Sequence, residues 1–236
     1  MSDQTAVQLF GRSYFTTRYG GELDAWSKYA LARELEPQVR FLTAGNGSQP
    51  RLLDLGCGLG RVLDVLEQGS RQCFGVDVSH FALGHARRDG HAVAQALVHA
   101  LPFVDARFDG VLMRDVLDLI PSAEVPRVLV ELGRVLDPGG RLVLSVMNYA
   151  HPLARATFSN DPHHCTPFQP AELLAACRVA GFDGVVRQEH TIAGLPGLGV
   201  LVKARLYGPA YATAHAHARV TGRRMHAVFY GRKAHT

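Results

Sequence analysis

Two features of the chain have residue types and spacing that could do chemistry: a glycine-rich segment and an acid further along. Residues 54–60 have the sequence DLGCGLG, directly after a short apolar stretch. Glycines at alternate positions allow positive φ and let a ligand lie against bare backbone, and amides at a helix start can hold a carboxylate or phosphate. Asp77 ends a second apolar stretch, where a carboxylate can bind the two hydroxyls of a ribose. Together these features predict a nucleoside ligand.

His164 is the first candidate for a general base, with His163 and His151 after it. The segment 161–168 follows an expected strand and precedes an expected helix, so it should border the ligand edge of a sheet. The alternative is a structural histidine that bonds a loop carbonyl. The run His163, His164 and Cys165 does not predict a metal site, because neighbours in an extended segment point to opposite sides and no further ligand has suitable spacing.

The elements that must position these residues alternate regularly between strand and helix. The pattern predicts strands over 51–55, 72–76, 91–95, 109–113, 141–147, 184–188 and 225–231, and helices over 61–68, 80–88 with Ser79 as N-cap, 122–136 with Ser122 as cap, and 172–180. Strands that alternate with helices imply βαβ units. We therefore expect an α/β fold with a doubly wound, seven-stranded, mostly parallel sheet.

Two regions outside the sheet are expected to cover the site. An N-terminal helix over 23–42, with a break near Pro37, and the aromatic residues Tyr14 and Phe15 before it suggest a helical lid or substrate cap. The turn-forming residues 43–50 then divide the chain into a cap, 1–45, and a cofactor-binding domain, 46–236. A long connection over about 191–224 suggests a helical insertion that roofs the site. The alternative is that the N-terminal aromatic residues simply pack the helix onto the core.

Composition excludes several classes of protein. The 236 residues are 47% apolar and 19% charged, which is incompatible with a disordered chain, and no apolar run approaches a membrane span. The four cysteines show no CxxC spacing or disulfide density, so we expect a reduced, cytoplasmic protein. Seven basic residues and no acidic one follow Glu189. This segment could meet an anionic partner, or be a solvated basic face.

Several ordered motifs resemble those of class I S-adenosylmethionine-dependent methyltransferases. The pattern Asp-x-Gly-x-Gly-x-Gly at 54–60 is similar to their first motif, whereas a dinucleotide fingerprint needs a small residue where Arg61 stands. The segments LPF at 101–103, FDGV at 108–111, ELGRVLDPGGRL at 131–142 and AGF at 180–182 are similar to later family motifs, and 161–168 to the small-molecule branch. The resemblance covers roughly residues 50–190.

The resemblance implies a Rossmann-like methyltransferase fold and S-adenosylmethionine as the cofactor. Carried over residue by residue, it implies cofactor contacts from Asp54, Gly56, Cys57, Gly58, Gly60, Asp77, Val78, Leu97, Val98, Met113 and Arg114. Asp115, just past the fourth strand, should line the cleft with Arg114. The chain departs from many relatives in having Leu97 where an acid meets adenine, and Asp118-Leu119 in place of a Glu-His pair. No histidine role is carried over to that pair.

The function expected from these residues is methyl transfer to a small-molecule acceptor, at a hydroxyl or amine of a hydrophobic or anionic molecule. A base is needed only if the acceptor is protonated, as a hydroxyl is. One alternative is a nucleic-acid methyltransferase, although the Asn/Asp-Pro-Pro-aromatic motif of base-amino methylation is absent and residues 113–116 read MRDV in its place. A second is a protein that binds S-adenosylmethionine without turnover. Neither a metal nor a particular oligomeric state is predicted.

Overall fold

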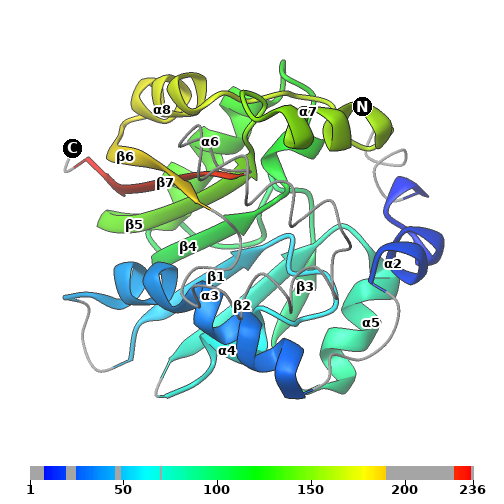
Figure 1. Ribbon diagram of the computed structural model, residues 1–236. Coiled ribbons are helices and arrows are strands. Elements are labelled where there is room, and N and C mark those ends of the chain that lie inside the picture. Colours follow the sequence, from blue (N-terminus) through cyan, green and yellow to red (C-terminus); the bar gives the residue numbers. More distant parts are fainter. Residues whose placement is uncertain (1–7, 20–24, 46–48, 70, 190–225, 235–236) are drawn as a thin grey trace.

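Seven strands form one mixed sheet that carries the other elements. The computed structural model describes residues 8–19, 25–45, 49–69, 71–189 and 226–234. Within them the strand order is β3-β2-β1-β4-β5-β7-β6, and β7 alone runs in the direction opposite to the other six strands (Figure 1). The strands are β1 (Arg51–Leu55), β2 (Gln72–Asp77), β3 (Val93–Gln95), β4 (Phe108–Arg114), β5 (Leu136–Met147), β6 (Phe182–Glu189) and β7 (His226–Lys233). The expected α/β fold with a mostly parallel, seven-stranded sheet is confirmed.

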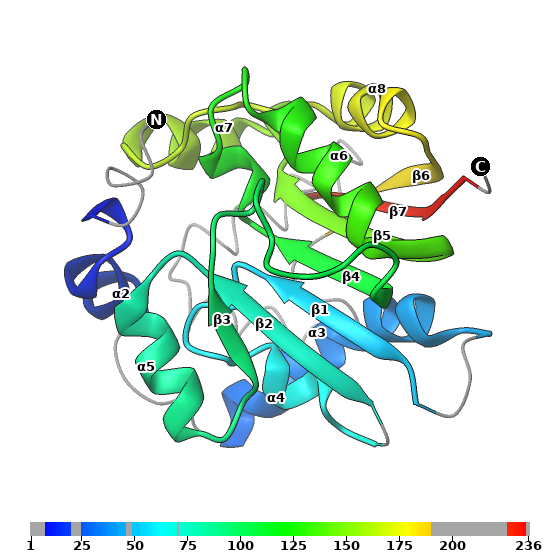
Figure 2. The same cartoon turned by 180° about the vertical axis from the view of Figure 1, so that it is seen from behind.

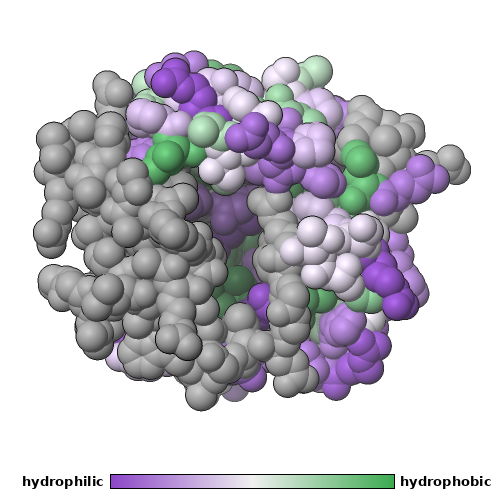
Figure 3. All heavy atoms as spheres, turned by 45° about the vertical axis from the view of Figure 1, so that its right-hand side comes forward, coloured by the Kyte–Doolittle hydropathy of each residue, from purple (hydrophilic) through white to green (hydrophobic). Residues whose placement is uncertain are grey.

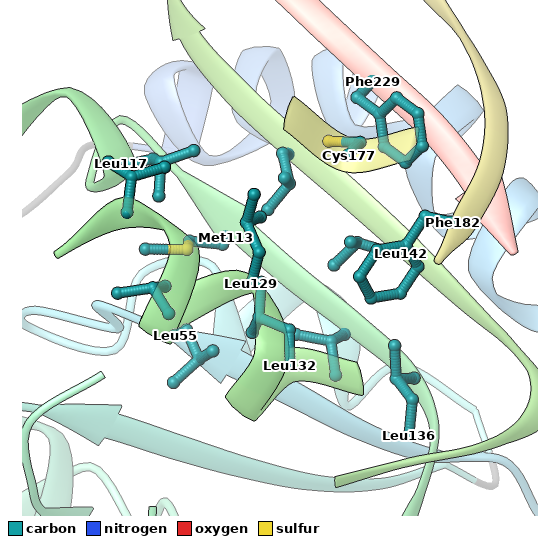
Figure 4. Packing of buried hydrophobic residues seen from close by; sticks show 14 of the residues in the cluster. Leu55, Met113, Leu117, Leu129, Leu132, Leu136, Leu142, Cys177, Phe182 and Phe229 are labelled. Carbon is teal, nitrogen blue, oxygen red and sulfur yellow. The ribbon is translucent and has the colours of Figure 1, made fainter. Parts of the chain in front are cut away.

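Helices cover both faces of this sheet. One face packs against α3 (Ala25–Thr43), α4 (Leu63–Leu66) and α5 (His80–Arg88), and the other against α6 (Val125–Val135) and α8 (Pro170–Val179). Figure 2 shows α3 and α4 behind the strands and α6 in front of them. Two fully buried aromatic rings, Phe182 and Phe229, lie with Leu132 and Cys177 in the core on the α6 side (Figure 4). Both strand faces are apolar because both are covered.

The strand order reverses between β1 and β4, which lie side by side in the middle of the sheet. Leu55 pairs with Met113 at the carboxyl ends of these two parallel strands. The connections after β1 and β4 therefore leave toward opposite faces of the sheet, and a crevice opens between them. In open α/β sheets this crevice is where ligands bind.

The predicted break near Pro37 is wrong, because α3 continues through this residue to Thr43. Pro37 is exposed, on the helix face away from the sheet, so the hydrogen bond it cannot donate leaves no buried group unpaired. Next to Pro37, Glu36 forms ion pairs with Arg33 and Arg40, which lie one turn before and after it. Burial of the apolar face of α3 against the sheet outweighs the local cost of proline.

Other boundaries also differ from the expectations. Ser122 does not cap α6, because residues 121–124 form a turn, Glu124 takes the N-cap position, and Pro126 fixes the first helical turn. The helix expected over 61–68 is only the four residues of α4. Three short elements were not predicted: α2 (Arg12–Tyr19), the 3-10 helix η1 (Leu117–Leu119) and α7 (Pro152–Asn160).

The proposed insertion, 191–224, lies outside the described residues. None of the helices in the described ranges is long and apolar enough to span a membrane.

Gly75 of β2 gives a test of the packing between the first two βα units. A Cβ at this position would lie 2.7 Å from Cys57 Sγ, 2.8 Å from Leu63 Cδ1 and 2.9 Å from Val93 Cγ1. Gly75→Ala should lower the free energy of unfolding by about 1–3 kcal/mol through overpacking, measured by chemical denaturation. Gly84→Ala is the control: its Cβ meets only Arg88 at 3.8 Å, in the interior of α5, so it should stabilise by about 0.5–1 kcal/mol. Equal effects would contradict the packing described.

Candidate functional site

The glycine-rich loop leaves β1 and folds back against the end of β2. The amides of Gly56 and Cys57 both donate to the carbonyl oxygen of Val76, at 2.7 and 3.0 Å. Gly56, Gly58 and Gly60 have φ values of 75°, 52° and 88°, in the left-handed region that favours glycine. The loop conformation therefore depends on the glycines themselves, which explains their alternate spacing.

Asp77, the last residue of β2, ties this loop to the next helix. Its Oδ2 accepts a hydrogen bond from the amide of Gly58 and its Oδ1 one from the amide of Ser79, both at 2.8 Å. Burial raises the pKa of Asp77, and these amide hydrogen bonds act in the opposite direction. Ser79 in turn caps α5, accepting from the amide of Ala82, as predicted. A carboxylate oxygen can accept more than one hydrogen bond, so Asp77 keeps acceptor capacity for a ligand.

Asp54 is a buried carboxylate that lacks a partner for one oxygen. Its exposed fraction is 2%, and its Oδ2 has no hydrogen bond in the described structure. Burial raises the pKa of Asp54 to about 7, with Arg114 opposing and Asp77 reinforcing the rise. A buried polar atom without a partner is costly. The arrangement therefore fits a cationic ligand group, which would satisfy the oxygen and favour the ionised form.

Arg114, at the end of β4, is held by a buried ion pair with Glu34 of α3. The two side chains are only 11% and 7% exposed. Burial on its own would lower the pKa of Arg114, but the carboxylates of Glu34, Asp115 and Asp54 outweigh it and raise the pKa. The guanidinium is therefore permanently charged and already paired. This pair attaches the N-terminal helix to the carboxyl end of the sheet.

A pocket of about 720 Å³, including its part open to solvent, lies at this edge of the sheet. It is lined by seven of the predicted cofactor residues: Gly56, Gly58, Asp77, Val78, Leu97, Val98 and Arg114. Figure 3 shows a hollow on this side of the molecule in which hydrophilic and hydrophobic residues lie next to each other. The loop after β1 and the segment after β4 thus share one cavity, as the strand-order reversal requires.

Four predicted cofactor residues lie behind the pocket wall. Asp54, Cys57, Gly60 and Met113 are buried and do not line the pocket. Gly60 faces His91, whose Cδ2 would be 2.6 Å from an added Cβ, so this glycine is needed for packing. Asp54 differs from the other three, because its charge interacts with Arg114 and Asp77, which both line the pocket.

Helix α2, together with Phe10 two residues before it, brings aromatic side chains to the pocket. Phe10, Tyr14 and Phe15 line it, and Phe15 Cε1 would be 3.3 Å from a Cβ added at Gly58. Tyr14 packs against Phe10 and against His163, at centroid distances of 5.0 and 4.9 Å. Phe10 was not predicted, because it lies on no periodic pattern. Val116, Leu119 and Ile120 were also missed, although their place directly after β4 could have identified them.

His164 is buried next to the pocket rather than in its lining. Its side chain is 2% exposed, with Nε2 3.8 Å from Asp118 Oδ2 and Nδ1 3.5 Å from Asp161 Oδ2. Its ring lies 5.0 Å from that of Phe158, centroid to centroid. His163 is more exposed and its Nδ1 is 2.7 Å from Asp161 Oδ1. No group of three or more potential metal ligands occurs within the described ranges.

Comparison with known proteins defines the class. The family described as methyltransferase domain matches residues 26–188. The chain therefore belongs to this family of S-adenosylmethionine-dependent methyltransferases, and S-adenosylmethionine is its cofactor. The family assignment agrees with the buried, unpaired Asp54 oxygen beside the glycine loop, which suits the ammonium of the cofactor's amino acid portion.

Individual relatives extend this similarity. An uncharacterized protein of Mycobacterium tuberculosis is 40% identical over 157 residues, covering 64% of this chain and 52% of that protein. A ubiquinone biosynthesis O-methyltransferase of Methylococcus capsulatus is 26% identical over 181 residues, covering 69% and 72%. A crystal structure of an S-adenosylmethionine-dependent methyltransferase from Archaeoglobus fulgidus superposes with a TM-score of 0.67 at 17% identity, covering 94% and 99%. The chain thus spans about half the length of the first relative.

Asp54 predicts that stability falls as the pH rises toward neutrality. The pKa of Asp54 is about 7 in the folded protein, whereas an unperturbed aspartate has a pKa of about 3.9. Between these values the folded protein binds more protons, so the free energy of unfolding should decrease from about pH 4 to 7 and then level off. The difference between the two pKa values corresponds to roughly 4 kcal/mol.

Chemical denaturation across this pH range measures the effect. Asp54→Asn never ionises and should flatten the decrease, whereas Asp183→Asn, at an exposed position on β6, should retain it. The comparison isolates Asp54 because other acids titrate equally in all three proteins. A decrease of the same size in Asp54→Asn and in the unsubstituted protein would contradict the raised pKa.

Proposed function

We propose that this protein transfers the methyl group of S-adenosylmethionine to a small-molecule acceptor. The observation that carries the proposal is the unpaired Oδ2 of Asp54, two residues before Gly56 of the pocket wall. An ammonium is the partner this oxygen lacks. The ubiquinone biosynthesis O-methyltransferase among the relatives supports a small acceptor, since its name describes methylation of an oxygen in the synthesis of a small molecule.

Each part of the site has a role in this proposal. Asp54 holds the ammonium of the cofactor, directly or through water, while Asp77 accepts hydrogen bonds from the ribose hydroxyls. Backbone groups and apolar side chains at Leu97 and Val98 bind the adenine, in the absence of the acid that many relatives have. The bound cofactor supplies a methyl group on a positively charged sulfur. The work of the protein is then to align donor and acceptor and to exclude water, and such alignment dominates catalysis.

A division of the chain into a cap and a cofactor-binding part belongs to the same proposal. We propose that residues 1–45 form the cap over the acceptor and residues 46–236 hold the cofactor. Phe10, Tyr14 and Phe15 of the proposed cap line the pocket and support this role, although α3 packs on the sheet as part of the core. A cytoplasmic location stays a prediction from the composition.

The rival functions are separated by two measurements. Calorimetry with S-adenosylmethionine tests binding, and mass spectrometry of a panel of acceptors tests for the gain of one methylene. Binding without product from any small molecule or nucleic acid would favour a protein that binds S-adenosylmethionine without turnover. Modification of nucleic acid alone would favour a nucleic-acid methyltransferase. Absence of S-adenosylmethionine binding would overturn the proposal itself.

Asp77→Asn should weaken S-adenosylmethionine binding. The variant retains the side-chain shape but loses one charged acceptor, which corresponds to about 1.5–3 kcal/mol, or roughly a ten- to hundredfold rise in Kd by calorimetry. Gly58→Val should bind more weakly still, because φ is 52° and Phe15 leaves no space for a branched side chain. Ser79→Ala, which removes the α5 cap but no pocket residue, is the control. Unchanged affinity in Asp77→Asn would remove Asp77 from the cofactor site.

Two roles for His164 remain open, and His164→Ala separates them. A general base would lose roughly 10²–10⁴ in kcat, with cofactor affinity and fold preserved. Its burial between Asp118, Asp161 and Phe158 leads us to expect the other result: a lower thermal midpoint and nearly normal turnover per folded molecule. Both are measured on the same sample, with the panel's best acceptor. A steep fall in kcat without loss of stability would make His164 the base.

A further inference from the structure

Asp115 combines an exposed carboxylate with an unusual backbone conformation inside the pocket. It follows β4 directly, lines the pocket, and has a side chain that is 45% exposed. Its φ is 54°, in the left-handed region that non-glycine residues rarely adopt. Such strained positions cluster at functional sites, where the surrounding structure has to maintain them. Aspartate and asparagine tolerate this region better than most residues.

Two neighbouring strands hold this carboxylate in place. The amide of Asp115 donates to the carbonyl oxygen of Ser145 at 2.8 Å, and Ser145 Oγ donates to Asp115 Oδ1 at 3.2 Å. Nε2 of His226, the first residue of β7, lies 3.7 Å from the same Oδ1. Ser145 is 1% and His226 8% exposed. Both side-chain contacts are made to Oδ1, and Oδ2 receives no hydrogen bond from a described residue.

The surroundings of Asp115 define what could meet Oδ2. Val116, Leu119 and Ile120 form an apolar wall next to it, and Phe10 and Tyr14 line the same pocket. Arg114, the one arginine or lysine among the described residues that line the pocket, is already paired with Glu34. An anionic group at this place would thus face a carboxylate, and the described residues that line the pocket offer no unpaired cation to compensate it.

We propose that Asp115 Oδ2 accepts a hydrogen bond from the nucleophilic O–H or N–H of an apolar, non-anionic acceptor, with His226 and Ser145 as positioning residues. This inference rests on the proposed methyl transfer and narrows the acceptor, because it selects hydrophobic molecules and excludes anionic nucleophiles. Asp115 orients the lone pair of the acceptor by holding its hydrogen, and such orientation is the main requirement of the reaction.

The proton balance for a hydroxyl acceptor is simple. The oxygen lone pair forms a bond to the methyl carbon, the electron pair of the broken carbon–sulfur bond stays on sulfur, and the hydroxyl proton passes to the Asp115 carboxylate. Since Asp115 is 45% exposed, solvent can then take the proton. No oxidant, reductant or metal is required.

Three single-ring probes test the charge preference of this subsite: phenol, benzylamine and benzoate. Their binding to the protein saturated with S-adenosylhomocysteine is measured by NMR titration. We expect the unsubstituted protein to bind phenol and benzylamine about tenfold more tightly than benzoate. Asp115→Asn keeps the shape and tolerates the left-handed backbone, so it should abolish this preference through lost charge alone. Asp89→Asn, at an exposed position after α5, is the matched control.

Affinity for S-adenosylhomocysteine separates this inference from the proposed function. It should stay within about twofold in Asp115→Asn, because Asp115 is assigned to the acceptor and not to the cofactor. If the unsubstituted protein fails to bind S-adenosylhomocysteine, the proposed function fails. If it binds but shows no probe preference, or if Asp115→Asn keeps the preference, only the present inference fails. An equal loss of cofactor and probe affinity in Asp115→Asn would assign Asp115 to the cofactor site and would also overturn the present inference.

The positioning roles need a readout that a loss of stability would not change. Ser145→Ala and His226→Gln should each reduce the phenol and benzylamine preference about threefold, and neither should reduce it further when combined with Asp115→Asn. This non-additivity is the signature of residues that act through one another. Additive losses in the double variants would show that Ser145 and His226 act independently of Asp115, and would overturn their assignment as positioning residues.

Discussion

The buried guanidinium of Arg114 is the charge around which the site is organised. A charge with an 11% exposed side chain would be very costly without partners. Glu34 of α3 supplies the direct partner, and Asp54 and Asp115 lie close enough to contribute. The N-terminal helix is therefore bound to the sheet electrostatically as well as by its apolar face. Removal of Glu34 would leave the guanidinium without its direct partner in the lining of the pocket, so α3 and the site depend on each other.

Three aspartates around the pocket have different properties because their surroundings differ. Asp54 is buried and lacks a partner for one oxygen, and this burial raises its pKa to about 7. Asp77 is almost as buried but accepts two amide hydrogen bonds, which fix the glycine loop and the start of α5. Asp115 is about half exposed, and its carboxylate is held through one oxygen only. The same side chain can thus keep a buried oxygen unpaired, shape a loop or present a half-exposed carboxylate to the pocket.

The parts of the fold that the sequence predicts are those with a local cause. The alternate glycines after β1 need positive φ at three places, Asp77 ends a strand of strong apolar pattern, and Ser79 caps a helix through its own side chain. The helix break expected at Pro37 was wrong because the energetic cost of proline is local, whereas burial of the opposite face of α3 stabilises the whole helix. Ser122 was misjudged because a turn and Pro126 fixed the start of α6 instead. Tertiary packing outweighed local propensity in both cases.

The residues of the site were also predicted where their cause is local, and missed where distant segments of the chain meet. The places of Gly56, Gly58 and Asp77 in the pocket lining could be predicted because the glycine motif and the acid at the end of the next strand also form the loop structure. Phe10 and His226 lie near the two ends of the described chain, and no spacing in the sequence connects them with the strand ends they approach. Their positions follow from the insertion of β7 between β5 and β6 and from the packing of α2 against α5. In the proposed assignment, cofactor residues are therefore encoded locally, whereas residues on the acceptor side are assembled by topology, which is why a sequence motif identifies the cofactor but not the acceptor.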